Sequence, residues 1–373
     1  MPAGNNDRGV TAQRKRVFSV PKGGAGSRVA FSNRFLTRLK EVFVEMRKLT
    51  VSALLLAFLV FALCGAASAD PKDYKGKIGI SLPTATHGYM GRVNWWVKKA
   101  IEDWKKKSPE LEFLVVTADS VSKQAADIED LMIKEIDALV CFPFDSSLTS
   151  VIEKVYDKGI YTVVLDRGTT KPVYDIYISN DDEGYTREGT KWIAEQLGGK
   201  GKLVIIEGIP CEINTIRVNT IKETAAKYGL EVLDSQPGMW NAEKALAVME
   251  NYLQKYPQID AVYTADDDMM KGALQAYKES GRKDVKIFLG GAADKEILKM
   301  IMEGSNPLVR ANVTYPPDCI ATAIGLAVLG HNNQVLEGFY QKKLPVRIIL
   351  AAELITKENA EQYYMEDELN FGK

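Results

Sequence analysis

The sequence predicts an α/β protein made of two similar lobes, each built on a doubly wound parallel sheet. After residue 70, short runs that are apolar on both faces alternate with amphipathic helical segments. This alternation is typical of parallel strands whose crossover helices cover the sheet. The pattern restarts near residue 175, and the restart predicts a second lobe.

The expected strands of the first lobe are 77–82, 112–119, 137–143 and 161–167, and helical patterns at 93–107 and 122–135 follow the first two. The second set of strands is expected at 175–180, 202–208, 230–236, 260–266 and 285–291, and a helix is expected over 183–197. The rest of the chain contains a segment with two prolines at 312–318, a long apolar helix at 319–330 and a largely apolar segment at 344–356. Prolines at 316, 317 and 345 mark places where the chain is expected to cross between lobes.

Composition excludes several classes of function. The 373 residues include 48 basic and 49 acidic side chains, so no polybasic surface for nucleic acid is expected. Two histidines and four cysteines leave little room for a zinc site, and we expect no metal and no cofactor. Neither a P-loop nor a G-x-G-x-x-G turn follows the first strand, so a nucleotide site is poorly supported.

The segment 46–69 has the pattern of a secretory signal. A basic start is followed by an uncharged apolar run and by Ala67-Ser68-Ala69, so cleavage is expected after Ala69. A retained membrane anchor and a lipoprotein cut at Cys64 are the alternatives. Residues 1–45 are predicted to be an untranslated extension ahead of a start at Met46, or else a disordered tail.

The remaining cysteines, at 141, 211 and 319, are odd in number and widely spaced. That pattern argues against a disulfide framework. Buried single thiols are therefore expected.

Polar clusters stand at the carboxyl ends of several predicted strands: Asp166-Arg167, residues 180–182 and residues 266–268. Ligands of open parallel sheets bind at those ends. The aspartates at 266–268 lack the spacing of a calcium loop, so Asp267 or Asp268 is expected to cap the next helix. Asp266 is expected to face the cleft.

Two aromatic residues, Tyr89 and Trp240, lie beside predicted strand ends. Aromatic rings pack on the C–H faces of a sugar, while carboxylates and guanidinium groups form hydrogen bonds with its hydroxyls. No G-x-S-x-G elbow occurs, and neither histidine has an evident catalytic partner. A glycosidase-type pair of carboxylates stays open as the enzyme alternative.

Residues 75–350 resemble the periplasmic sugar-binding proteins of bacterial ABC importers, in the ribose-binding branch of the type I fold. The resemblance rests on VLDR, SND, SQPGMW, DDDMMKGALQA and YPPD, which occur in family order. It implies two lobes joined by three hinge crossovers, near 179–182, 312–316 and 344–347. The implied first lobe is 74–180 plus 316–345, and the second is 181–313 plus 346–373.

The resemblance also implies a set of ligand-binding residues, and departures from the family pattern among them. Phe142 stands where ribose binders carry an Asn, Ala292 where they carry an Asp, and Tyr315 where a Gln is usual. The pocket should therefore lack about three hydrogen-bonding groups, which disfavours ribose and favours another sugar or a polyol. The expected ligand-binding residues are His87, Tyr89, Phe142, Asp166, Arg167, Arg217, Trp240, Asp266 and Tyr315.

The implied function is capture of a monosaccharide or polyol in the periplasm and its delivery to a membrane permease, by a monomer that catalyses nothing. Three alternatives stay open: a sugar-binding protein that serves a chemoreceptor or sensor kinase, a regulator of the lactose-repressor type, and an enzyme. The regulator needs a DNA-binding segment at the start of the chain, where the signal pattern lies instead.

Overall fold

The computed structural model describes residues 73–367. The predicted extension at 1–45 and the predicted signal at 46–69 lie outside this range. Within the range, no helix combines the length and the apolar character that crossing a membrane requires.

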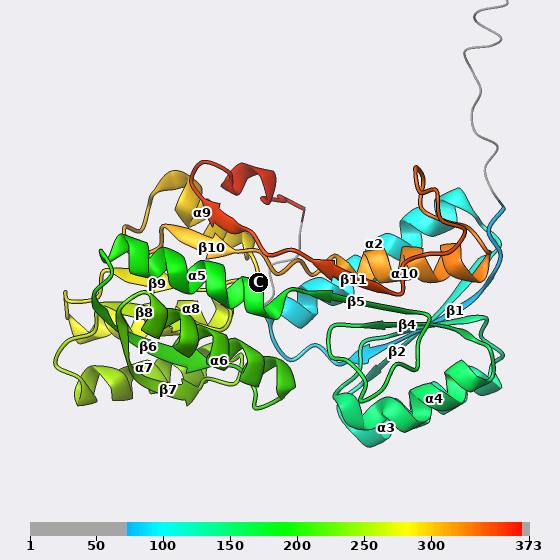
Figure 1. The fold of residues 1–373 in the computed structure, drawn as a ribbon, viewed down its shortest axis with the longest axis horizontal. Coiled ribbons are helices and arrows are strands. Elements are labelled where there is room, and N and C mark those ends of the chain that lie inside the picture. Colours follow the sequence, from blue (N-terminus) through cyan, green and yellow to red (C-terminus); the bar gives the residue numbers. More distant parts are fainter. Residues whose placement is uncertain (1–72, 368–373) are drawn as a thin grey trace, which may run out of the picture. The chain divides into compact units, whose positions relative to one another are not determined.

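The first lobe is a parallel sheet of six strands in the order β11-β5-β4-β3-β1-β2. Helices α2 and α10 cover one face, and α3 and α4 cover the other (Figure 1). The strands are β1 Gly76–Pro83, β2 Leu111–Ala118, β3 Ala138–Cys141, β4 Tyr161–Leu165, β5 Ile176–Asn180 and β11 Arg347–Leu350. The helices are α2 Gly88–Lys107, α3 Val121–Ile133, the short η1 Ser146–Leu148, α4 Thr149–Asp157 and α10 Cys319–His331.

The inner strands β1, β3 and β4 are buried on both faces of this sheet, which explains why they read as nearly continuous apolar runs. Ile78 and Ile80 of β1 pack in the cluster formed with α2 and α10, whereas Leu139 and Val164 pack in the cluster formed with α3 and α4. Because β1, β3 and β4 pair in parallel, their carboxyl ends lie at the same edge of the sheet.

The second lobe contains a parallel sheet in the order β7-β6-β8-β9 and an antiparallel pair, β10 with β12. Residues of α5 and α6 pack on one face, and residues of α7, α8 and α9 pack on the other. The strands are β6 Gly201–Glu207, β7 Leu230–Pro237, β8 Ala261–Thr264, β9 Ile287–Leu289, β10 Ala311–Val313 and β12 Leu354–Thr356. The helices are α5 Asp182–Gln196, α6 Glu212–Lys227, α7 Ala242–Lys255, α8 Asp267–Ser280, α9 Lys295–Glu303 and the short η2 Ala360–Gln362.

The predicted position of the third crossover between the lobes was wrong by a few residues. The sequence division placed 346–373 with the second lobe, but β11 pairs in parallel with β5 of the first sheet. Pro345 was interpreted as the boundary, yet it lies two residues before β11, an edge strand of the sheet, where a proline is tolerated. The chain crosses instead between Leu350, the end of β11, and Leu354, the start of β12. The rest of the predicted division stays a prediction.

All three cysteines among residues 73–367 are free thiols, as the sequence predicted. Two of them, Cys141 and Cys319, are buried. Cys211 is only partly buried and lines a cavity described below.

Helices α7 and α8 pack so closely that the contact tolerates no methyl group at Gly272. A Cβ there would lie 2.0 Å from the carbonyl oxygen of Ala242. Gly272→Ala is expected to lower the free energy of unfolding by at least about 1 kcal/mol, measured by urea denaturation. Gly325→Ala in α10 is the matched control, since its new methyl meets nothing closer than 3.5 Å. An equal loss in both variants would contradict this explanation.

Candidate functional site

The nine residues that the sequence predicted as ligand contacts all line one cavity between the two lobes. They are His87, Tyr89, Phe142, Asp166, Arg167, Arg217, Trp240, Asp266 and Tyr315. Met90, Tyr185, Ile213, Ala265 and Ala292 complete the lining. Most follow the carboxyl ends of strands, which is where parallel sheets of this kind place their ligands. That these residues bind a ligand stays a prediction.

Asp166 follows β4 with a left-handed φ of 60° and is buried. The Tyr177 hydroxyl donates to its carbonyl oxygen at 2.6 Å, which fixes this unusual backbone. The Tyr315 hydroxyl donates to its Oδ2 at 2.9 Å. Burial and the nearby Asp182 raise the pKa of Asp166 to about 6. The sequence prediction counted Tyr315 as a lost hydrogen-bonding group, but its hydroxyl orients this carboxylate.

Arg217, on the inner face of α6, forms a buried ion pair. Its Nε donates to Oδ1 of Asp182 at 2.8 Å, and both side chains are largely shielded from solvent. The guanidinium carbon lies 4.3 Å from the ring centroid of Tyr315 and 4.8 Å from that of Tyr185. Burial alone lowers the pKa of Arg217, but Asp182 and the tyrosines outweigh it and hold that pKa well above its ordinary value. The group therefore stays charged.

Arg167 lies between two aromatic rings. Its Nη1 donates to the carbonyl oxygen of Phe144 at 2.6 Å. Its guanidinium carbon lies 5.5 Å from the ring centroid of Phe142 and 5.8 Å from that of Trp240. These distances permit cation–π attraction with both rings.

Trp240 forms an aromatic wall together with His87. The two rings stack at 5.6 Å with an interplanar angle of 25°. Gly208 makes room for the indole, because a Cβ there would lie 2.4 Å from it. Burial, together with the charge of Arg167, lowers the pKa of His87 to about 4, so this imidazole is neutral at pH 7.

Asp266, rather than Asp267 or Asp268, caps α8. Its Oδ1 accepts the backbone N–H of Met269 at 2.8 Å, so the prediction about capping was wrong. Burial and the charge of Asp268 raise the pKa of Asp266 to about 7. The two aspartates that follow it form other hydrogen bonds. Asp267 accepts a hydrogen bond from the side-chain amide of Asn312 at 2.7 Å, and Asp268 accepts one from the backbone N–H of Gly88 in the first lobe.

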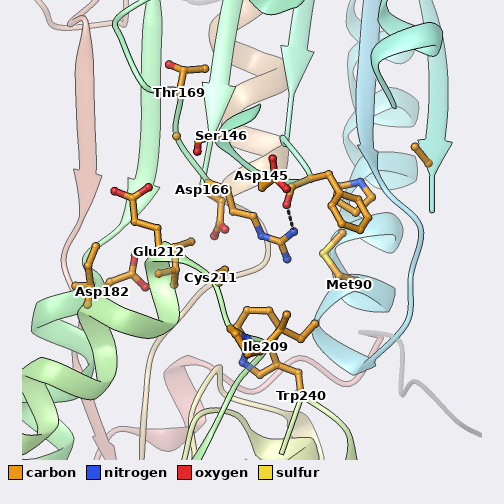
Figure 2. A pocket seen from close by; sticks show the side chains of 18 of the residues that line it. Met90, Asp145, Ser146, Asp166, Thr169, Asp182, Ile209, Cys211, Glu212 and Trp240 are labelled. Carbon is orange, nitrogen blue, oxygen red and sulfur yellow. Dashed lines mark hydrogen bonds between the residues drawn. The ribbon is translucent and has the colours of Figure 1, made fainter. Parts of the chain in front are cut away.

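The cavity opens into a larger outer chamber. The inner cavity leaves about 40 Å³ for the centres of water molecules, and the chamber leaves about 700 Å³. Figure 2 shows the side chains that line the chamber, among them Asp145, Asp166, Asp182, Glu212 and Trp240. Six residues line both spaces: His87, Met90, Asp166, Arg167, Ile213 and Trp240. The inner cavity therefore adjoins the chamber along these six residues. No group of three or more potential metal ligands lies within residues 73–367.

Comparison with known families identifies this architecture. The model of the periplasmic binding protein domain matches residues 78–323, which is more than half of the chain. The chain belongs to the periplasmic binding protein family.

Two relatives of this periplasmic binding protein are 30% identical to it. One is the ribose import binding protein of Bacillus subtilis, over 254 residues that make up 68% of this chain and 80% of the relative. The other is a xylitol-binding protein of Mycolicibacterium smegmatis, over 310 residues that make up 80% of this chain and 82% of the relative. A similar solved structure is an ABC transporter solute-binding protein of Bacillus halodurans with bound myo-inositol. It has a TM-score of 0.68 and 23% identity, and the match covers 78% of this chain and 98% of that one.

The family and the fold that the sequence predicted for this periplasmic binding protein, a type I protein with two parallel-sheet lobes, are thus confirmed. The structure also places the predicted departures in the cavity, since Phe142 and Ala292 both contribute apolar lining there.

Two side chains that contact Arg217 in this periplasmic binding protein were not among the ligand contacts predicted from the sequence. Asp182, which belongs to the polar cluster 180–182, pairs with Arg217. Tyr185 lies three residues later on α5, so the same face of one helix brings both side chains to the arginine. This spacing was the signal that was available in the sequence.

Proposed function

We propose that this protein captures a monosaccharide or a related polyol between its lobes in the periplasm and delivers it to the permease of an ABC importer. The observation that carries the proposal is the buried cavity in which two carboxylates, two guanidinium groups and several aromatic rings converge. Carboxylates accept hydrogen bonds from hydroxyl groups, guanidinium groups donate to them, and aromatic rings pack on the C–H faces of a sugar.

The charges of the cavity favour a neutral guest. Arg217 is compensated by Asp182, and Arg167 lies near Asp166. The pKa of Asp266 is raised to about 7, so this third group carries only part of a negative charge at neutral pH, and the charges around the cavity largely offset one another. The similar proteins named above bind ribose, xylitol or myo-inositol, which supports the class of ligand. Phe142 and Ala292 offer no side-chain hydrogen bond, so we propose a ligand other than ribose.

A thermal-shift screen of the whole protein tests this proposal. The panel is D-ribose, D-allose, D-fructose, L-arabinose, xylitol and myo-inositol, each at several concentrations. A ligand at one hundred times its dissociation constant adds about 2.7 kcal/mol of stability, which is readily detected. We expect at least one sugar or polyol to raise the melting temperature and D-ribose to give a smaller shift. No shift with any member would contradict the proposal, and chemical change of a bound sugar after incubation would favour the enzyme alternative.

Ligand affinity is expected to rise with pH, because hydroxyl groups bond more strongly to ionised than to protonated carboxyl groups. The pKa of Asp266 is about 7 and that of Asp166 about 6. Binding of the strongest member of the panel should therefore be roughly tenfold weaker at pH 6 than at pH 7.5, as measured by titration calorimetry. Asp266→Asn is the matched control, since asparagine also caps helices. This variant should flatten the profile, and an unchanged profile would exclude Asp266 as its source.

The unliganded protein should show the opposite trend in stability. Because the pKa values of Asp166 and Asp266 are raised on folding, the folded state binds more protons than the unfolded state between about pH 4 and pH 7. Protonation of these two groups therefore stabilises the fold, and their contribution is lost as the pH rises through about 6 to 7.

A further inference from the structure

The loop that follows β9 is held by the other lobe. Arg92 of α2, in the first lobe, donates from Nη1 to the carbonyl oxygen of Ala292 at 2.7 Å and from Nη2 to that of Ala293 at 3.2 Å. A second bond between the lobes lies close to it, where the backbone N–H of Gly88 donates to Oδ2 of Asp268 at 2.6 Å. Gly88 and Arg92 lie one helical turn apart on α2, so this turn meets the second lobe at both points.

The two alanines have a backbone that alanine adopts only under constraint. Their φ angles are 82° at Ala292 and 55° at Ala293, both in the left-handed region. Such a conformation persists in a non-glycine residue only where surrounding contacts impose it.

All four backbone polar groups of this pair are bonded, and the bonds come from two sources. The second lobe supplies the partners of the N–H groups, which donate from Ala292 to the carbonyl of Val313 and from Ala293 to Oδ1 of Asn312. The first lobe supplies the partner of both carbonyl groups, and that partner is Arg92. Separation of the lobes removes half of these constraints at once.

Ala292 is also part of the cavity wall, whereas Arg92 does not line the cavity. We propose that Arg92 is a positioning residue that couples the approach of the lobes to the shape of this wall. With Arg92 in place, the left-handed turn is held and Ala292 closes its side of the cavity. Without it, the turn relaxes and the cavity loses that side. The consequence for binding rests on the proposed function, but the coupling does not.

An arginine suits this task because its planar fork reaches two carbonyl oxygens at once, whereas the ammonium group of lysine is a point charge. Arg92→Lys keeps the charge and removes the fork. Arg92→Met removes both and keeps an unbranched side chain. Lys98→Met, at an exposed position of the same helix, is the control for loss of charge from α2.

Hydrogen–deuterium exchange of the full, unliganded chain tests the coupling without any ligand. In Arg92→Lys and Arg92→Met, amides in 290–294 and at Gly88 should exchange at least about fivefold faster than in the wild type, while those of β6 stay unchanged. Lys98→Met should match the wild type throughout. Unchanged exchange at 290–294 in both arginine variants would overturn the proposal. So would equal acceleration in β6, because Arg92 would then only stabilise the fold as a whole.

Titration calorimetry with D-allose, xylitol and myo-inositol tests the consequence for binding. For any of these that binds the wild type, Arg92→Lys should weaken affinity at least about fivefold, or about 1 kcal/mol. Unaltered affinity in both arginine variants would overturn the link to the cavity. If the wild type binds no probe of the larger panel, the proposed function fails, and the exchange experiment still decides the coupling.

Discussion

Replacement of Arg217 by methionine is expected to lower the free energy of unfolding by about 3–5 kcal/mol. The Asp182 carboxylate would then be buried without its partner, and breaking a buried ion pair from one side costs about this much. The two tyrosine rings also lose the cation that they flank. The measurement is urea unfolding followed by circular dichroism. We expect ligand binding to be lost in the same variant, since Arg217 lines the cavity.

Two further variants make this result specific. Asp182→Asn combined with Arg217→Met removes both charges and should recover most of the lost stability. Arg187→Met breaks an ion pair on α5 whose side chains are 47% and 65% exposed, so its cost should stay below about 1 kcal/mol. If Arg217→Met costs no more than Arg187→Met, the buried pair does not stabilise the second lobe.

Replacement of Asp166 by alanine is expected to weaken ligand affinity about 30-fold, or by about 2 kcal/mol. The variant deletes a buried carboxylate that the Tyr315 hydroxyl orients toward the cavity, and a hydrogen bond to a charged group is worth about 1.5–3 kcal/mol. Calorimetry with the strongest ligand of the panel gives the value. A loss below threefold would rule out a direct role for Asp166 in binding.

Companion variants separate charge from orientation at this position. Asp166→Asn keeps an oxygen that can accept from Tyr315, so any loss of affinity reports the charge. Tyr315→Phe keeps the ring beside Arg217 and removes only the hydroxyl, so its loss reports the orientation of the carboxylate. We expect a smaller effect for Tyr315→Phe than for Asp166→Ala.

The fold and the strand-end members of the cavity were predicted from local pattern, whereas His87, Phe142, Arg217 and Tyr315 were predicted only through the resemblance to a known family. Buried parallel strands read as apolar runs, and the polar group that follows each run lies at the edge where strands end. Asp166 and Arg167 after β4, and Asp266 after β8, were found in this way.

What the sequence did not predict depends on contacts between distant segments. Arg92 bonds to a residue 200 positions away, and nothing in the helical pattern of α2 sets it apart from its neighbours. The choice of Asp266 as the helix cap depends on where β8 ends, since three consecutive aspartates offer the same chemistry. The membership of β11 was decided by pairing with β5, which an apolar run alone does not specify.

The partly exposed thiol at Cys211 has a practical consequence for biosensing. Among residues 73–367 its two fellow cysteines are buried, so a maleimide dye would attach at this position in preference to them. The dye would lie at the start of α6 beside the entrance to the cavity, where its emission responds to changes in local polarity. The folded domain thus already carries an attachment point for an optical reporter of its own occupancy.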